Sequence, residues 1–179
     1  MSTKLVLFVV AHEGYQSVEY AVPKKLLEQA GYKVVTASDK PGTATATDNS
    51  QVPVDIVLSK VNTDHYDGIF FVGGSGSLPH LDNPISYNLI KKAHAVHKVI
   101  GAICIATRIL AQSGILTDKS ATGWNGDNEL GPLYKKYNIN YVPEDVVVDD
   151  TIITAAGPPA AEKYGQDCLS LLQAQGSWE

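Results

Sequence analysis

Short apolar runs that alternate with stretches of helical spacing are the feature that most constrains how this chain can fold. Residues 5–10 form an unbroken run rich in β-branched side chains, which is typical of a strand covered on both faces in a parallel sheet. Similar runs follow at residues 32–37, 69–72 and 99–103. Helical patterns separate most of these runs, so the sequence predicts an α/β fold with helices on both faces of an open, mainly parallel sheet.

Two helical segments have recognisable ends. The first runs from Ser17 to a stop at Gly31, and it contains Pro23. Because proline lacks the backbone N–H and clashes with the preceding turn, we expect a kink or a later helix start at this point. A second helix is predicted to open at Asn83-Pro84, where proline suits the first turn. The residues expected on its buried side are Ile85, Leu89, Ala93 and Val96.

The remaining segments complete the predicted architecture. Residues 41–48 contain few apolar side chains and are expected to form a peripheral loop or small hairpin. Residues 141–154 contain short strand patterns around an Asp149-Asp150 turn, which predicts a small antiparallel addition to the sheet. The last helix is expected to bury Tyr164, Cys168, Leu171 and Leu172.

Length, charge and cysteine content limit the classes of protein. The 179 residues suit a single domain spanning 1–179, with no second domain expected. A formal net charge of -5 and the lack of a basic block argue against nucleic-acid binding. The apolar run 5–11 is shorter than the roughly 20 residues that cross a membrane, and we expect a cytoplasmic protein. Cys104 and Cys168 are too few for a disulfide framework and are expected to remain thiols.

Cys104 is the sharpest chemical feature of the sequence. The predicted strand 99–103 passes through Cys104 directly into a helical pattern that ends near Gly114. The thiol is therefore expected at a helix N-terminus, at the carboxyl edge of the sheet where ligands bind. Unpaired amides and the helix dipole there favour the thiolate, which is the nucleophilic form. A small buried hydrophobic residue is the alternative, and it is our interpretation of Cys168.

Backbone donors are expected close to Cys104. Gly73-Gly74 follow the strand 69–72, and glycine lets the backbone approach a ligand closely. The amides of this pair, together with that of Ile105, are candidates for holding an oxyanion, although a glycine pair also makes ordinary turns. The pair matches neither the P-loop nor the dinucleotide-binding fingerprint, and no nucleotide or other cofactor is expected.

Glu19 and His12 are candidate acid–base groups. Glu19 lies in the first turns after the first strand, where burial raises a carboxyl pKa and allows proton donation; a solvated helix acid is the alternative. His12 follows the same strand and is a candidate base, or it packs at the strand end. His94 and His97 have metal-compatible spacing without a completing Cys, Asp or Glu cluster, and we interpret them as surface residues with no metal site.

Trp124-Asn125 precede the antiparallel segment and are expected at the same edge of the sheet as Cys104. Several reactive side chains and backbone donors therefore share one predicted edge. The candidate pocket residues are His12, Gly73, Trp124 and Asn125.

Several motifs, in order along the chain, resemble the ThiJ/PfpI superfamily, often called the DJ-one family. The central ones are Glu19, Val72-Gly73-Gly74 and Ala102-Ile103-Cys104. The resemblance covers nearly the whole chain, and an ordered set is much more specific than any one motif. The other matching segments are residues 5–8, 30–34, 66–68, 114–116 and 154–158.

The resemblance implies a flavodoxin-like three-layer α/β/α sandwich, similar to class I glutamine amidotransferases, that forms a homodimer or a higher homo-oligomer. It implies that Cys104 is the nucleophile, that Glu19 is its protonated partner, and that the amides of Gly74 and Ile105 bind an oxyanion. Family members have been assigned as proteases, glyoxalases or deglycases, isocyanide hydratases and oxidation-sensing chaperone-like proteins. A small-molecule substrate is the partner that this resemblance implies.

The chain departs from the family pattern at positions that bear on activity. PfpI-type proteases have a histidine directly after the nucleophile, where this chain has Ile105, which argues against proteolysis. Trp124 stands where human deglycase-like relatives have histidine, and Ala156 replaces an arginine. Glutamine amidotransferases need a late His and Glu pair, but no histidine follows His97. Isocyanide hydratases use an aspartate at the position of Glu19.

Two functions from different classes follow. The first is a cofactor-free cysteine hydrolase or lyase acting on small reactive carbonyls or their adducts, in which Cys104 attacks carbon and Glu19 shuttles a proton. The second is a redox-sensing or chaperone-like stress protein, in which Cys104 is oxidised to a sulfinic acid without turnover. A third interpretation is a degenerate site kept for binding, with Trp124 closing the pocket.

Overall fold

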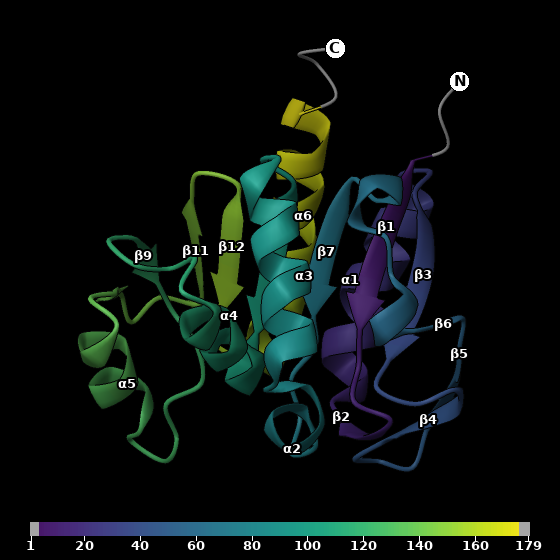
Figure 1. Cartoon of the computed structure of the whole chain (residues 1–179), viewed down its shortest axis with the longest axis horizontal. Helices are drawn as coiled ribbons and strands as arrows, with labels where there is room; N and C mark the ends of the chain where they lie inside the picture. The colour runs from purple at the N-terminus through teal and green to yellow at the C-terminus, as the bar shows by residue number, and fades with distance from the viewer. Residues whose placement is uncertain (1–3, 176–179) are drawn as a thin grey trace.

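A seven-stranded sheet with helices on both faces forms the centre of the computed structural model, which describes residues 4–175 (Figure 1). Its strands are β1 (Leu5–Val9), β3 (Lys33–Ser38), β6 (Ile56–Val57), β7 (Gly68–Phe71), β8 (Val99–Ile103), β11 (Val146–Asp149) and β12 (Ile152–Ala155). The strand order is β11-β12-β8-β7-β1-β3-β6, and only the β11–β12 pair is antiparallel within this sheet. The predicted α/β sandwich with a mainly parallel sheet is confirmed.

Helices cover the two faces of the sheet and enclose separate hydrophobic clusters. On one face α1 (Ser17–Gln29) packs against α6 (Ala161–Gln175), and on the other α3 (Pro84–Ala95) packs against α4 (Thr107–Ser113) (Figure 1). The shorter helices are α2 (Ser77–Leu81) and α5 (Leu130–Lys136). Short 3-10 turns occupy Leu58–Lys60, Thr63–His65, Cys104–Ala106 and Pro158–Ala160.

Pro23 lies inside α1, which begins at Ser17, so the predicted later start of this helix is wrong. The proline is buried where α6 approaches closely: a Cβ added at Gly165 of α6 would lie only 2.9 Å from the Pro23 Cα. The helix loses one backbone hydrogen bond at the proline, and burial against α6 compensates. Tertiary packing therefore overrides the local preference of proline.

The start of α3 was predicted correctly, and its buried face was predicted in part, since Leu89 and Ala93 are buried as expected. Asn83 Oδ1 accepts hydrogen bonds from the first amides of the helix, as an N-cap residue does. Ile85 and Val96, both expected inside, are exposed. The buried residues are Ser86, Leu89, Ile90 and Ala93. The buried stripe therefore includes Ser86 in place of Ile85, and Ile90 in place of Val96.

Two small sheets accompany the main one. β4 (Gly42–Ala46) and β5 (Gln51–Val54) form an antiparallel hairpin, as one of the two expectations for residues 41–48 required. However, β4 also pairs in parallel with β2 (Glu13–Tyr15), the segment that directly follows β1. The hairpin therefore lies outside the seven-stranded sheet, as a peripheral segment does, and β2 joins it to the chain that directly follows β1.

The antiparallel addition is smaller than predicted. β11 and β12 form the expected hairpin around Asp150, which adopts a left-handed conformation with φ 59. Within the range 141–154, Tyr141 does not join this hairpin. It belongs to β10 (Asn140–Tyr141), which pairs in parallel with β9 (Ser120–Ala121) in a separate sheet. A two-residue strand has too little pattern to predict its partner.

The strand order determines where a crevice forms. β1 pairs with β3 on one side and with β7 on the other, and β6 lies outside β3, so the chain changes direction across the sheet between β6 and β7. In open parallel sheets a ligand site forms at such a reversal, outside the carboxyl ends of the strands. The carboxyl ends of β1, β7 and β8 are adjacent to this point.

Candidate active site

Cys104 lies at a sharp turn between β8 and α4. It has a left-handed backbone with φ 61, which is unusual for a residue with a side chain and marks local strain. A 3-10 turn occupies Cys104–Ala106, and the regular helix begins only at Thr107 and already ends at Ser113. The thiol is half-buried and packs against the hydrophobic cluster under α1 and α6. The predicted strand–cysteine–helix junction exists, with a tighter turn than expected.

Glu19 and Cys104 meet across Gly73. Glu19 is fully buried in α1, and its Oε2 accepts a hydrogen bond of 2.9 Å from the Gly73 amide at the end of β7. A Cβ on Gly73 would lie 2.5 Å from Glu19 Oε2 and 2.7 Å from the Cys104 Cβ. Only glycine fits between the two side chains. The fold therefore brings together three residues that the sequence analysis selected separately.

The environment of Glu19 shifts the pKa of its carboxyl group toward neutrality. Burial raises the pKa of Glu19 to about 7, and interactions with the Cys104 thiol and the Gly73 amide offset part of that effect. Its Oε1 is buried and has no hydrogen-bond partner of regular geometry among residues 4–175. The solvated helix acid considered in the sequence analysis is thus excluded by the burial of this side chain.

The pKa of the Cys104 thiol is raised, whereas the sequence analysis expected the thiolate to be favoured. Burial, followed by the negative charge of Glu19, raises the pKa of Cys104 to about 12, while the amides of Ile105 and Gly74 lower it. A helix N-terminus was expected to stabilise the thiolate, but the 3-10 turn and the short α4 weaken that effect. These shifts favour a protonated Cys104 thiol over a preformed thiolate.

The amides of Gly74 and Ile105 both face the Cys104 sulfur, as their effect on its pKa requires. Gly74 has φ 116, and a Cβ there would lie 2.4 Å from the Gly14 carbonyl oxygen. The adjoining backbone is pinned to the segment after β1, because the Gln16 amide donates to Gly73 O at 2.9 Å. The geometry can present two N–H donors beside the sulfur, which suits the stabilisation of an oxyanion.

His12 is engaged away from the cysteine. Its Nε2 hydrogen bonds to the Pro41 carbonyl at 3.1 Å, and its backbone amide donates to Asp39 Oδ1 at 2.8 Å. The same Asp39 accepts a 2.9 Å bond from Nδ1 of His80 on α2, a histidine that the sequence analysis did not select. His80 and Asp39 are 41 residues apart, so no local sequence pattern around His80 predicts this contact. Among the described residues, no hydrogen bond joins either histidine to Cys104.

Trp124 is attached to the cysteine turn, whereas Asn125 has a structural role. The Trp124 amide donates to Cys104 O at 3.3 Å, and its indole is 36% exposed. Asn125 Oδ1 accepts from the Leu130 amide at 3.0 Å and so helps to start α5. Arg108 contacts Trp124 from α4. It escaped the sequence analysis because it lies within an apolar helical pattern.

The two histidines with metal-compatible spacing do not share a helix. His94 belongs to α3, but His97 lies beyond its end with φ 56. Among residues 4–175, no group of three or more His, Cys, Asp and Glu side chains is arranged to hold a metal ion. In the same part of the chain, no helix combines the length and apolar character needed to cross a bilayer.

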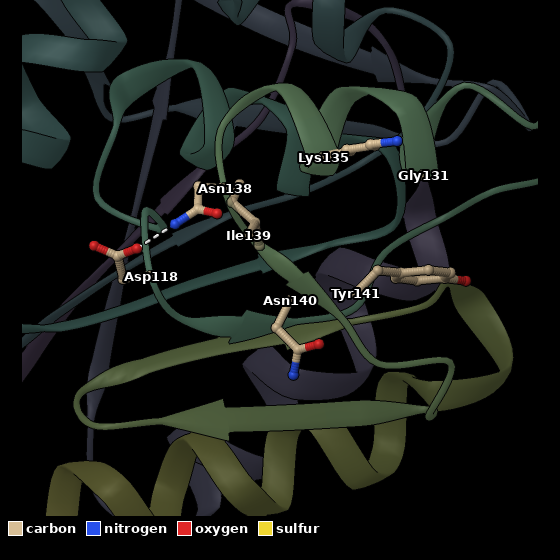
Figure 2. A pocket seen from close by; sticks show the side chains of 7 residues that line it. All are labelled: Asp118, Gly131, Lys135, Asn138, Ile139, Asn140 and Tyr141. Atoms are coloured by element: carbon tan, nitrogen blue, oxygen red, sulfur yellow. Dashed lines mark hydrogen bonds between the residues drawn. The ribbon is translucent and has the colours of Figure 1, made fainter.

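A surface cleft lies elsewhere, beside α5 and β10. Figure 2 shows its lining, with Asn138 hydrogen bonded to Asp118 at one end and the side chains of Lys135 and Tyr141 at the other. The cleft measures about 650 Å³ and contains none of the predicted site residues. It also contains no cysteine.

Comparisons with known proteins identify relatives over nearly the whole chain. The model of the DJ-1/PfpI family matches residues 4–171. An uncharacterized protein of Methanocaldococcus jannaschii, MJ0967, is 32% identical over 97% of this chain and 84% of its own length. Deglycase PH1704 of Pyrococcus horikoshii is 26% identical over 94% of this chain and 99% of its own.

Two further similarities concern activity and fold. The glutathione-independent glyoxalase DJR-1.2 of Caenorhabditis elegans is 22% identical over 95% of this chain and 89% of its own length. The crystal structure of a ThiJ/PfpI domain protein from Brachyspira murdochii superposes with a TM-score of 0.91 at 28% identity. That superposition covers 97% of this chain and 99% of the other.

Proposed function

Because this chain belongs to the DJ-1/PfpI family, we propose that it is a cysteine-dependent enzyme acting on small reactive carbonyls or their adducts, similar to deglycases and glyoxalases. The observation that carries the proposal is the meeting of Cys104 and the buried Glu19 across Gly73. This arrangement combines a nucleophile, a proton acceptor and two backbone donors without a cofactor.

The addition step uses each of these groups once. As the Cys104 sulfur forms a bond to the carbonyl carbon, ionised Glu19 takes the thiol proton and the π electrons of the C=O bond move to oxygen. The amides of Gly74 and Ile105 donate hydrogen bonds to the resulting oxyanion. Glu19 then returns the proton to that oxygen, which leaves a neutral hemithioacetal. A carboxyl pKa of about 7 suits both halves of this exchange at neutral pH.

Two alternatives receive less support. Oxidation sensing needs a readily formed thiolate, whereas burial and Glu19 raise the pKa of Cys104 to about 12. Proteolysis in the PfpI manner needs a histidine directly after the nucleophile, and this chain has Ile105 there. His12 and His80 hydrogen bond to Pro41 and Asp39 and not to Cys104, so neither replaces the missing histidine.

The test is turnover of methylglyoxal and of its thiol adduct by the wild type and by matched cysteine variants. Cys104→Ser is expected to abolish turnover, while Cys168→Ser retains it because Cys168 lies in the core under α6. Retained activity in Cys104→Ser would reject the proposal. Sulfinic acid formed on Cys104 under mild peroxide, with no turnover of either carbonyl by the wild type, would favour the redox alternative.

Glu19→Gln separates the two effects of the carboxyl group. Turnover is expected to fall, because the thiol proton loses its acceptor. Alkylation of Cys104 by iodoacetamide is expected to begin at lower pH, because a negative neighbour that raises the thiol pKa is gone. A shift of that profile to higher pH would instead mean that protonated Glu19 stabilises a thiolate, which contradicts the proton transfer written above.

A further inference from the structure

Arg108 is a nearly buried cation one helical turn after Cys104. Only 8% of the residue is exposed. Its Nη2 donates to the Trp124 carbonyl at 3.3 Å and to Asp127 Oδ1 at 2.6 Å, and the guanidinium carbon lies 5.6 Å from the centre of the Trp124 ring. A single guanidinium nitrogen, Nη2, therefore binds the backbone carbonyl and the acid of one loop, and the guanidinium group also lies near the aromatic ring of that loop.

The loop that Arg108 binds, residues 122–130, is fixed from its other side as well. A Cβ on Gly126 would lie 2.6 Å from the Trp124 indole, so the ring packs directly on the Gly126 backbone. Asp127 Oδ1 also accepts the Glu129 amide at 3.1 Å. The indole is thus held between the Arg108 guanidinium and the Gly126 backbone, and these two contacts determine its position.

This loop reaches the nucleophile through the backbone. The Trp124 amide donates to Cys104 O at 3.3 Å, and Thr107 Oγ1 donates to the same oxygen at 3.0 Å. The oxygen of Cys104 and the N–H of Ile105 belong to one peptide unit, which is planar and trans. In such a unit the C=O and N–H bonds lie in the same plane and point in opposite directions. Contacts that hold the Cys104 oxygen therefore also restrict the direction of the Ile105 N–H.

We infer that Arg108 is a positioning residue that aims the Ile105 amide at the Cys104 sulfur and at the oxygen of a bound carbonyl, by holding the Trp124 loop. The catalytic part of this inference rests on the proposed function. Its effect on the thiol does not, because the Ile105 amide acts on the sulfur whether or not a substrate is turned over. The two can therefore fail separately.

The test compares Arg108→Met with the wild type in the full chain. Alkylation of Cys104 by iodoacetamide, followed by peptide mass mapping from acidic to alkaline pH, is expected to shift to higher pH and to slow about tenfold near neutrality. With methylglyoxal, kcat is expected to fall about ten- to a hundredfold while KM changes little, since a misaimed oxyanion donor affects the transition state. Arg108→Lys keeps the charge but loses the planar guanidinium group. Its alkylation profile and kcat are expected to lie between those of the wild type and Arg108→Met.

Two further variants act on the loop from other sides. Gly126→Ala pushes the indole without changing any charge, and Asp127→Asn weakens the pairing with Arg108; both are expected to shift the alkylation profile in the same direction. The matched control is Lys119→Met, which removes an ion pair with Asp149 far along the chain and is expected to leave the profile unchanged.

The outcomes decide separately between the positioning role and the proposed activity. A folded Arg108→Met with a wild-type alkylation profile overturns the inference, and if that variant does not fold, unchanged profiles in Gly126→Ala and Asp127→Asn overturn it. Altered alkylation in these variants, together with a wild type that turns over no carbonyl, supports the positioning role and rejects the proposed function.

Discussion

Cys104 and Cys168 carry the same thiol in two very different regions of the molecule. Cys168 lies inside α6, is 1% exposed, and contacts Tyr164 in the core. Cys104 lies at a strained turn at the edge of the sheet, beside Glu19 and two backbone amides. Burial raises the pKa of both thiols. The difference is that Cys104 has a buried carboxyl group and two backbone amides of other residues beside its sulfur, and the proposed function depends on these neighbours.

The largest expected effect is the contrast in alkylation between the two cysteines. In the native protein, Cys104 is expected to react with iodoacetamide at least about a thousandfold faster than Cys168, because a fully buried thiol reacts only when its helix opens. Peptide mass mapping of both sites in one sample measures this ratio. In denaturant the two alkylation rates should become equal. Comparable rates in the native protein would show that Cys104 is no more accessible to the reagent than Cys168.

The next effect in size is the pH dependence of stability at Glu19. Its pKa is about 7 in the folded chain against 4.5 as the ordinary value, so the folded state binds the proton more tightly than the unfolded state. The resulting stabilisation is fully present below pH 4.5 and is lost as the pH rises to about 7, which amounts to roughly 3 kcal/mol. Denaturant unfolding across this range is expected to show the loss in the wild type.

Glu19→Gln provides the control for that measurement, because glutamine has no proton to lose. The difference in unfolding free energy between wild type and variant should change across this window and stay constant above pH 7. Parallel curves for the two proteins would show that Glu19 is not the buried acid described here. Cys168, which lies in the core, is not expected to contribute to this window.

A smaller effect is expected when a methyl group is inserted between the two halves of the site. Gly73→Ala places a Cβ 2.5 Å from Glu19 Oε2 and is expected to cost about 1–3 kcal/mol of stability and to reduce turnover. Gly131→Ala is the matched control, because a Cβ there meets nothing within 4 Å and alanine favours the α5 helix by about 0.5–1 kcal/mol. Thermal unfolding of both variants checks the contrast, which equal costs would contradict.

Much of the fold could be predicted because its signals are local. The apolar runs correspond to β1, β3, β7 and β8 within one or two residues at each end. The helix stop at Gly114 and the N-cap at Asn83 also agree with the structure. α2 and α5 were not predicted, because segments of five and seven residues show too little periodicity.

Less of the candidate site was predictable, because its contacts join residues far apart in sequence. Glu19, Gly73 and Cys104 were selected from local patterns and motifs, but the raised pKa values of Glu19 and Cys104 depend on burial in the folded chain. Arg108 and His80 were missed, since their partners Trp124 and Asp39 lie 16 and 41 residues away. A pattern within one helix carries no information about such partners.

By itself, the sequence determined the alternation of strands and helices and the place of a cysteine at the end of a buried strand. Those features follow from apolar periodicity and glycine or proline punctuation, which act over a few residues. Only the tertiary structure decided that the Cys104 thiol is held protonated beside a carboxyl group that titrates near pH 7. The reason is that desolvation and charge coupling depend on everything packed around a group, and in this chain the helix α1, the end of β7 and the turn after β8 meet at Gly73.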